Sequence, residues 1–328
     1  MKSLVEKFPF QLEDAIKIGE ASIFKKSTTK IDNIVISGLG GSGIGGQIIS
    51  QLVKDIINIP IEINSDYNIP NYVSNNTLVI ASSFSGNTEE TLSSLQKAEE
   101  KGAEIACITS GGKLLEIAQN KKYNHIVLPT ERSPRAMLSY SLVQQLFLLH
   151  NYGFISDSFK KELKYAIILL NKLIPEIREQ SKTIAINIKD KTPIIYSDSS
   201  FEGVAIRMRQ QINENAKALC WHHVLPEMNH NELVGWAGGS KNNAVIMLRT
   251  DFDNSRTSVR MDVCKKIISQ HTDTYFEIYA KGESRIGQAL YLILFGDWLS
   301  VYLSELYNVD SIEIKVIDYL KSELAKVK

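Results

Sequence analysis

Two short segments of the sequence carry the residue types that bind phosphate groups. The segment 38–46 is dominated by glycine and directly follows an apolar, β-branched run. Glycine lets the backbone approach a ligand closely, and the N–H groups at a helix start attract anions. The segment 83–88 follows another apolar run and places serine and threonine hydroxyls around Gly86. Together the two loops predict a site for the phosphate of a small metabolite.

Each loop also has a simpler interpretation. The first contains a literal G-x-G-x-x-G from Gly38, and Asp66 follows the next strand, a pattern typical of dinucleotide-binding folds. The second could be an ordinary helix start in which Asn87 caps the helix and Glu90 closes a capping box. A dinucleotide fold has no use for a second, hydroxyl-rich loop. Ligands of open α/β sheets bind where such loops meet, so a phosphate monoester is favoured.

The loops require a parallel sheet to position them. Short β-branched runs alternate with longer amphipathic stretches in both halves, which indicates βαβ units and two doubly wound, flavodoxin-like α/β domains. A chain of 328 residues exceeds the usual limit of about 250 for one core, and we place the boundary between residues 153 and 154. The polar turn 196–200 resembles the glycine loop and suggests a weak internal repeat. The expected strands are 33–39, 60–65, 77–83, 104–110, 125–129, 193–197, 217–220, 244–249 and 275–280, and the expected helices are 45–54, 87–101, 134–150, 158–188, 201–215, 255–271, 287–307 and 316–328.

The composition argues against several classes of partner. Lysine plus arginine equals aspartate plus glutamate, 37 against 37, so the chain lacks the net positive charge that favours nucleic acid or an anionic membrane. No run approaches the ~20 apolar residues of a membrane-spanning helix, and we expect no signal peptide. Cys107, Cys220 and Cys264 are far apart in apolar runs, which predicts reduced core residues and a cytoplasmic location.

Beyond the two loops, four segments extend a resemblance along nearly the whole chain. The loops resemble the sugar isomerase (SIS) domain, which binds phosphosugars. Further segments resemble, in the same order, those of the bifunctional phosphoglucose/phosphomannose isomerases: 131–136 (ERSPRA), 213–217 (NENAK), 226–232 (PEMNHNE) and 317–321 (IDYLK). The resemblance implies two SIS-type domains in a homodimer. It also implies an aldose–ketose isomerase that interconverts glucose 6-phosphate, and mannose 6-phosphate, with fructose 6-phosphate through a cis-enediolate, without cofactor or metal.

Moving a carbonyl between C1 and C2 of a sugar needs a base, ring-opening groups and a cation near the enediolate oxygens. The family resemblance assigns the base to Glu214 and the cation to Arg135. It assigns ring opening to His230, which would reach the site of the partner subunit, and to Lys321, with Lys315 as the competing lysine. The remaining binding residues are Gly40 and Gly41 at the reacting carbons and Ser42, Ser83, Ser85 and Thr88 at the phosphate.

Each of these residues also has a structural alternative. Glu214 could be a solvated carboxylate, and Arg135 could form a surface ion pair with Glu131. Lys321 could flank a helix whose apolar residues Ile317, Leu320 and Leu324 face the core. His230 could be a hydrogen-bonded structural histidine, or belong to a metal cluster, although no H-E-x-x-H spacing is present. That cluster would contain His222, His223, Glu227 and Glu232.

Two functions of other classes remain open. A non-catalytic phosphosugar sensor would keep the loops without needing Arg135, Glu214 and His230. A nicotinamide-dependent dehydrogenase would use the glycine loop for a dinucleotide. The segment 309–314 departs from the proline-containing sequence common in the family, so the sequence does not predict a preference between glucose and mannose epimers.

Overall fold

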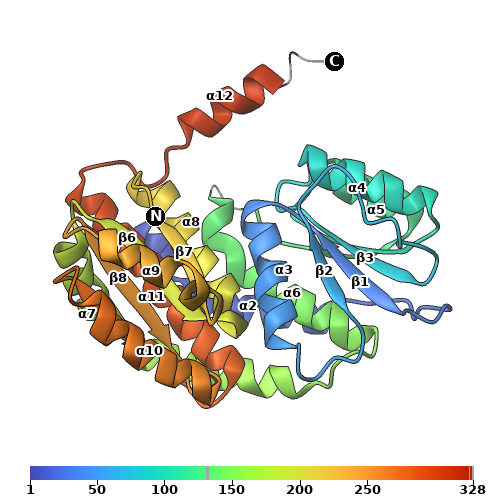
Figure 1. Cartoon of the computed structure of the whole chain (residues 1–328). Coiled ribbons are helices and arrows are strands. Elements are labelled where there is room, and N and C mark those ends of the chain that lie inside the picture. The colour runs from blue at the N-terminus through green and yellow to red at the C-terminus, as the bar shows by residue number, and fades with distance from the viewer. Residues whose placement is uncertain (131–132, 325, 327–328) are drawn as a thin grey trace.

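Two parallel β-sheets lie on either side of a shared layer of helices (Figure 1). The computed structural model describes residues 1–130, 133–324 and 326. Both sheets are parallel throughout, so the prediction of α/β architecture with two helix-flanked parallel sheets is confirmed.

The first sheet has the strand order β2-β1-β3-β4-β5, which is the flavodoxin-like order. Every residue of its central strand β3 is buried, as expected for a parallel strand covered on both faces. The strands are β1 (Asn33–Ser37), β2 (Ile61–Asn64), β3 (Thr77–Ser82), β4 (Glu104–Thr109) and β5 (Asn124–Val127).

Helices cover both faces of this sheet. On the outer face α4 and α5 pack on a small core, and on the inner face α3 and α6 join the large core that both sheets share. The sequence did not indicate the N-terminal helices, of which α2 packs on α6, nor α5. The helices are α1 (Lys2–Glu6), α2 (Phe8–Ala21), α3 (Gly40–Leu52), α4 (Glu89–Glu100), α5 (Gly112–Lys121), the short 3-10 helix η1 (Pro134–Met137) and α6 (Leu138–Asn151).

The second sheet repeats the order of the first with one strand fewer, as β7-β6-β8-β9. The internal repeat indicated by the turn 196–200 is therefore present in the topology. The strand expected at 217–220 is wrong, because the strand starts at Trp221, after Lys217 has adopted a left-handed conformation with φ 55°. The strands are β6 (Thr192–Asp198), β7 (Trp221–Leu225), β8 (Asn243–Arg249) and β9 (Tyr275–Tyr279).

The helices of the second half bring the two sheets together. α7, α8 and α11 belong to the shared layer, where α8 packs on α3, and α10 covers the outer face. α11 is long and apolar enough to cross a membrane by length and composition, but its apolar window is wholly buried inside the molecule. The helices are α7 (Ser158–Ile188), η2 (Ser199–Phe201), α8 (Glu202–Ala216), η3 (Glu227–His230), α9 (Glu232–Gly235), η4 (Trp236–Gly238), α10 (Ser255–Ile268) and α11 (Arg285–Leu306).

Each sheet has one point where the strand order reverses, between β1 and β3 in the first and between β6 and β8 in the second. In the first sheet the two loops at that point are residues 38–46, the glycine loop, and residues 83–88, the hydroxyl loop. In the second, the Asp198 carboxylate accepts hydrogen bonds from the backbone N–H groups of both loops, from Ser200 at 2.9 Å and from Asn254 at 3.4 Å.

The last helix, α12 (Lys315–Leu324), projects away from the body of the molecule (Figure 1). None of its residues is buried. Ile317, Leu320 and Leu324 are exposed, so the expectation that they face the core is wrong in this structure. Their helical spacing did predict an amphipathic helix, but an apolar stripe does not say which surface it covers.

Candidate active site

The glycine loop begins where β1 ends. A side chain at Gly38 would place its Cβ 2.8 Å from the carbonyl oxygen of Ser82, at the end of the neighbouring strand β3. Gly40 starts α3 with φ +53°, a conformation that L side chains rarely adopt. Both glycines are thus needed for the turn from β1 into α3.

The hydroxyl loop is held in shape by its own side chains. The hydroxyl groups of Ser83 and Thr88 are 2.8 Å apart, and the Gly86 N–H donates to Ser83 Oγ at 3.1 Å. Gly86 has φ +68°, and a Cβ there would lie 1.8 Å from the carbonyl oxygen of Gly111. Ser85 lies exposed beside it.

The capping-box interpretation of this loop is wrong. The residue before α4 is Thr88, and its side chain makes no capping hydrogen bond. The Asn87 side chain instead accepts a hydrogen bond from the Lys113 N–H at 3.1 Å, on the neighbouring helix α5. Asp66 likewise serves a local turn, because its carboxylate accepts from the Asn68 N–H at 3.2 Å.

The two loops lie side by side. Ser42 Oγ, in the first turn of α3, accepts a hydrogen bond from the Phe84 N–H at 3.2 Å. The structure thus brings together all six residues predicted to bind the sugar phosphate: Gly40, Gly41, Ser42, Ser83, Ser85 and Thr88. They gather at the strand-order reversal, where ligands of doubly wound sheets bind.

Arg135 lies directly beside the glycine loop. A Cβ on Gly41 would be 3.8 Å from the Arg135 Cα atom. The Arg135 side chain is buried, and its Nη1 atom is 3.4 Å from Oε2 of Glu214 on α8. Burial lowers the pKa of the Arg135 guanidinium, and the Glu214 carboxylate opposes that shift. Glu131, the alternative partner of Arg135, lies outside the described residues.

The surroundings of this pair come from the second half of the chain. Arg135 Nε donates to Asn215 Oδ1 at 2.8 Å, and Nη2 donates to the carbonyl oxygen of Ser311. Lys217 Nζ binds the carbonyl oxygens of Glu214 at 2.7 Å and Asp310 at 2.8 Å. Lys217 thus fixes the segment that leads to α12 against the end of α8. Neither Asn215 nor Lys217 had a predicted role, although both lie in the motif 213–217.

His230 makes no hydrogen bond or ion pair with Glu214 among the described residues. It ends η3 as an exposed side chain, and within the described residues it has no hydrogen bond or ion pair, so the hydrogen-bonded structural alternative is wrong. Its segment is well anchored, because Met228 is buried and Asn229 Nδ2 lies 3.0 Å from the sulfur of Cys264. His230 is therefore an exposed side chain on a segment that its neighbours hold in place.

The neighbouring histidines and glutamates form separate pairs. His223 Nδ1 is 2.9 Å from Glu232 Oε2, and His222 Nε2 is 3.8 Å from Glu202 Oε1. Among the residues that the structure describes, no group of three or more His, Cys, Asp or Glu side chains could hold a metal ion.

Lys321 and its competitor Lys315 both lie on α12, the helix that projects from the body of the molecule (Figure 1). Lys321 is exposed and makes no ion pair with any described residue. Contacts between described residues therefore join Arg135 to Glu214 and place it beside the glycine loop, whereas no described hydrogen bond or ion pair joins His230 or Lys321 to this group.

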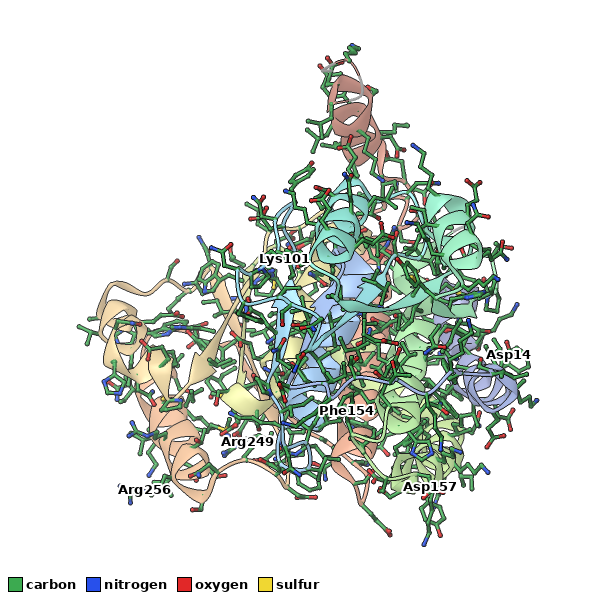
Figure 2. The ribbon with its side chains drawn as sticks, turned by 90° about the vertical axis from the view of Figure 1, so that its right-hand side faces the viewer. Asp14, Lys101, Phe154, Asp157, Arg249 and Arg256 are labelled. Carbon is green, nitrogen blue, oxygen red and sulfur yellow. The ribbon has the colours of Figure 1, made fainter. Side chains whose placement is uncertain are left out.

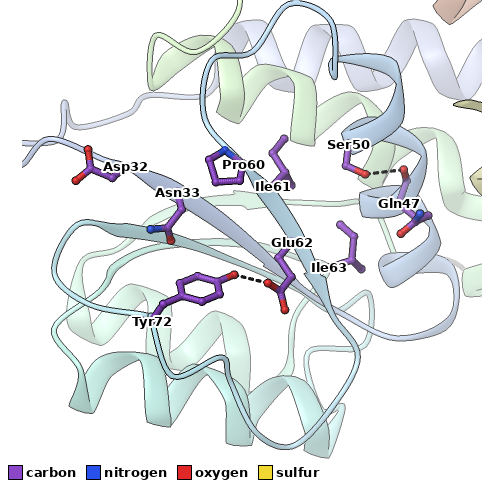
Figure 3. A pocket seen from close by; sticks show the side chains of 9 residues that line it. All are labelled: Asp32, Asn33, Gln47, Ser50, Pro60, Ile61, Glu62, Ile63 and Tyr72. Atoms are coloured by element: carbon purple, nitrogen blue, oxygen red, sulfur yellow. Dashed lines mark hydrogen bonds between the residues drawn. The ribbon is translucent and has the colours of Figure 1, made fainter.

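A surface pocket of about 620 Å³ lies elsewhere, beside the edge strand β2 (Figure 3). A hydrogen bond of 2.5 Å joins Tyr72 to Glu62 across it. None of the residues predicted to bind or convert a sugar phosphate lines this pocket. The lining residues are Asp32, Asn33, Gln47, Ser50, Pro60, Ile61, Glu62, Ile63 and Tyr72.

Comparison with known proteins identifies both halves of the chain. Residues 28–152 match the model of the SIS domain, and residues 177–324 match that of the bacterial phospho-glucose isomerase C-terminal SIS domain. A bifunctional phosphoglucose/phosphomannose isomerase of Caldicellulosiruptor bescii is 39% identical over 99% of this chain and 98% of its own length. A protein of the same name from Aquifex aeolicus is 36% identical over 92% of this chain and 93% of its own.

A solved structure shows the same fold at much lower identity. The C-terminal domain of glucosamine-fructose-6-phosphate aminotransferase from Francisella tularensis superposes with a TM-score of 0.73. It is 15% identical, and the match covers 95% of this chain and 96% of that one.

Proposed function

Because this chain belongs to the bifunctional phosphoglucose/phosphomannose isomerase family, we propose that it interconverts glucose 6-phosphate and mannose 6-phosphate with fructose 6-phosphate. The chain is an aldose–ketose isomerase, and the named relatives favour this function over a non-catalytic sensor. The reaction passes through a cis-enediolate, in which C1 and C2 of the open-chain sugar each carry an oxygen.

The observation that carries the mechanism is the pairing of Arg135 with Glu214 beside Gly41. The Glu214 carboxylate removes the proton from C2 of the aldose and returns it to C1, while the hydroxyl proton moves from O2 to O1, which leaves a hydroxyl at C1 and the carbonyl at C2. Arg135 stabilises the negative charge that develops on the enediolate oxygens. Its burial supports this role, since electrostatic attraction is stronger where water is excluded.

The phosphate lies at the other end of the site in this proposal. Ser42, Ser83, Ser85 and Thr88 hold it, while Gly40 and Gly41 admit the reacting carbons close to the backbone. The Ser42–Phe84 hydrogen bond supports the assignment, because it joins the two loops that would hold one phosphate group.

Ring opening would need residues that one chain alone does not bring to Glu214. We assign it to His230 of a second subunit, in a homodimer, and to Lys321. Exposed apolar side chains occur in the segments on both sides of His230: Leu219, Trp221 and Val234. Such side chains are typical of an interface between subunits.

Lys321 reaches the site in this proposal when α12 docks through its apolar face. The exposed stripe of Ile317, Leu320 and Leu324 supplies the driving force for docking. Lys315, at the start of the helix, is the alternative lysine.

The proposed chemistry uses no cofactor and no metal. A cytoplasmic location is part of the same proposal, and it is supported by Cys107, Cys220 and Cys264, which are buried free thiols, as in proteins of reducing compartments. The boundary between residues 153 and 154 stays a prediction.

A coupled assay with both hexose 6-phosphates, with and without a chelator, tests the proposed function. We expect turnover of glucose 6-phosphate and mannose 6-phosphate to fructose 6-phosphate, unchanged by the chelator. Titration with a nicotinamide dinucleotide should give no change in protein fluorescence. Ligand-induced stabilisation without turnover would instead indicate the sensor, and loss of turnover with chelator would indicate a metal.

A further inference from the structure

Arg135 is held from two sides by one buried polar network. Arg207 Nη2, on α8, donates to the carbonyl oxygen of Arg135 at 2.7 Å. The same atom donates to both carboxylate oxygens of Asp297, on α11, at 3.0 Å each. The backbone of Arg135 is therefore fixed to an ion pair that belongs wholly to the second half of the chain.

The guanidinium group is fixed to the same pair by another route. Asn215 accepts from Arg135 Nε through its oxygen and donates through Nδ2 to Ser300 Oγ at 2.9 Å. Ser300 Oγ in turn donates to the carbonyl oxygen of Asp297 at 2.7 Å. The hydrogen bonds thus close a circuit that starts and ends at Arg135.

The sequence positions explain how the circuit forms. Arg207, Gln211 and Asn215 are spaced by four residues on α8 and share one face of that helix. Asp297 and Ser300 are spaced by three on α11, which packs against it. Gln211 Nε2 donates to Asp297 Oδ1 at 2.9 Å and completes the contacts between the two helices.

The network is poorly explained by stability alone. Arg207 and Asp297 are 2% and 3% exposed, and a buried ion pair loses its hydration, so well-packed apolar residues are often equally stable in its place. Within the described residues, Arg207 Nε is also buried without a partner, which adds a further cost. Such an arrangement fixes a geometry better than it stabilises a fold.

We propose that Arg207, Asp297, Asn215 and Ser300 are positioning residues that fix Arg135 for the enediolate oxygens. This inference rests on the proposed role of Arg135. The circuit holds the backbone and Nε of Arg135, so the guanidinium plane is set before the sugar binds. A displacement of about 1 Å at such a group can cost on the order of 100-fold in rate.

The experiment is a double-mutant cycle between the network and Arg135. Ser300→Ala is the mild variant, because it removes one hydroxyl, and Asp297→Asn removes the buried charge. We expect each to lower kcat about 10-fold with KM within about twofold, since a transition-state interaction is affected. In an Arg135→Lys background, each should lower kcat less than about twofold, because the positioned group is already lost.

A matched control comes from another ion pair in the second half. Arg249 and Glu277 lie 3.0 Å apart with nearly buried side chains, and the hydrogen-bond partners of Arg249 lie on α10 and β9. Figure 2 shows Arg249 on the same side as Arg256 of α10. Glu277→Gln should lower the melting temperature of the enzyme while kcat stays within about twofold of the parent.

The outcomes separate the inference from the proposed function. If Arg135→Lys lowers kcat but Ser300→Ala and Asp297→Asn do not, the positioning role is wrong and the role of Arg135 stands. Equal losses of kcat in the parent and in the Arg135→Lys background would also overturn the positioning role, because they would show an effect independent of Arg135. If Arg135→Lys leaves kcat unchanged, the proposed role of Arg135 fails, and the positioning role fails with it.

A binding measurement provides a readout besides turnover. A hydroxamate that mimics the cis-enediolate should bind Ser300→Ala about 10-fold more weakly than the parent, with the affinity for fructose 6-phosphate within about twofold. Equal weakening of both ligands would indicate general damage to the site and contradict the inference.

Discussion

Nη1 of Arg135 and Oε2 of Glu214 lie 3.4 Å apart, although Arg135 follows the first sheet and Glu214 lies in the last turn of a helix of the second half. Neither half of the chain could form this pair alone. The α3–α8 contact between the two halves is therefore a condition for the proposed chemistry, and separate expression of either half should yield no isomerase.

Glu214→Gln should lower kcat at least about 100-fold for both hexose 6-phosphates, because the amide keeps the shape and loses the base. The matched control is Glu202→Gln on the same helix, since the Glu202 and Glu214 side chains are equally exposed, at 35%. Turnover of the Glu214 variant within about tenfold of the parent would show that another residue is the base.

Ser85→Ala should raise KM for glucose 6-phosphate about 10-fold with little change in melting temperature, because it removes an exposed donor to a charged phosphate. Inorganic phosphate should inhibit the variant more weakly than the parent. Ser93→Ala on α4 is the control, as its hydroxyl binds the carbonyl oxygen of Tyr67. An unchanged KM would remove Ser85 from the phosphate site.

His230→Ala and Glu214→Gln should complement each other when the two chains are co-expressed. If His230 acts in the partner subunit, each mixed dimer contains one intact site, so a random mixture recovers about a quarter of the parent activity. Pure His230→Ala and pure Glu214→Gln are the controls. A mixture no more active than the two controls would place His230 within its own subunit or outside the mechanism.

Lys321→Ala should lower kcat/KM by at least about 10-fold, while Lys315→Ala stays within about twofold. Leu320→Asp should have the effect of Lys321→Ala, because a charge on the apolar face of α12 prevents docking. If Lys315→Ala lowers kcat/KM and Lys321→Ala does not, the ring-opening role belongs to Lys315. Full activity of Leu320→Asp would show that α12 acts without docking.

The cysteine thiols should be unreactive in the folded enzyme. Burial raises the pKa of Cys107 and of Cys220 to about 12, and it also raises the pKa of Cys264. Since the thiolate is the reactive form and its fraction falls as the pKa rises, a thiol reagent at about pH 8 should label none of them quickly. All three should react after unfolding in denaturant. Rapid labelling of the native enzyme would contradict this burial.

The sequence predicted the sheets well, because parallel strands covered on both faces must be continuous apolar runs. Thr77–Ser82 is such a strand, and the loop after it is recognisable by its glycine and hydroxyl groups. α1 and α2 were missed because their starts lack capping side chains, with Lys7 between them. α5 was missed because it follows Gly111, and a pair of glycines resembles a turn.

The candidate site could be predicted only in part. Arg135 and Glu214 were chosen by motif, but their contact depends on how two helical layers pack, which no local pattern specifies. One feature of the sequence did indicate the polar network that holds Arg135. Asp297 is the only charged residue of α11 between Ile286 and Ser304, and a lone acid in an apolar helix needs a buried partner.

The two halves share one strand order, yet they differ in what lies at the point where that order reverses. In the first half, the two loops at this point are the ones proposed to hold the phosphate. In the second half, the carboxylate of Asp198 accepts the hydrogen bonds of the Ser200 and Asn254 N–H groups, so a side chain of the protein itself takes up the backbone donors there. The second half therefore takes part in the proposed catalysis through residues such as Glu214, which α8 carries to Arg135 of the first half.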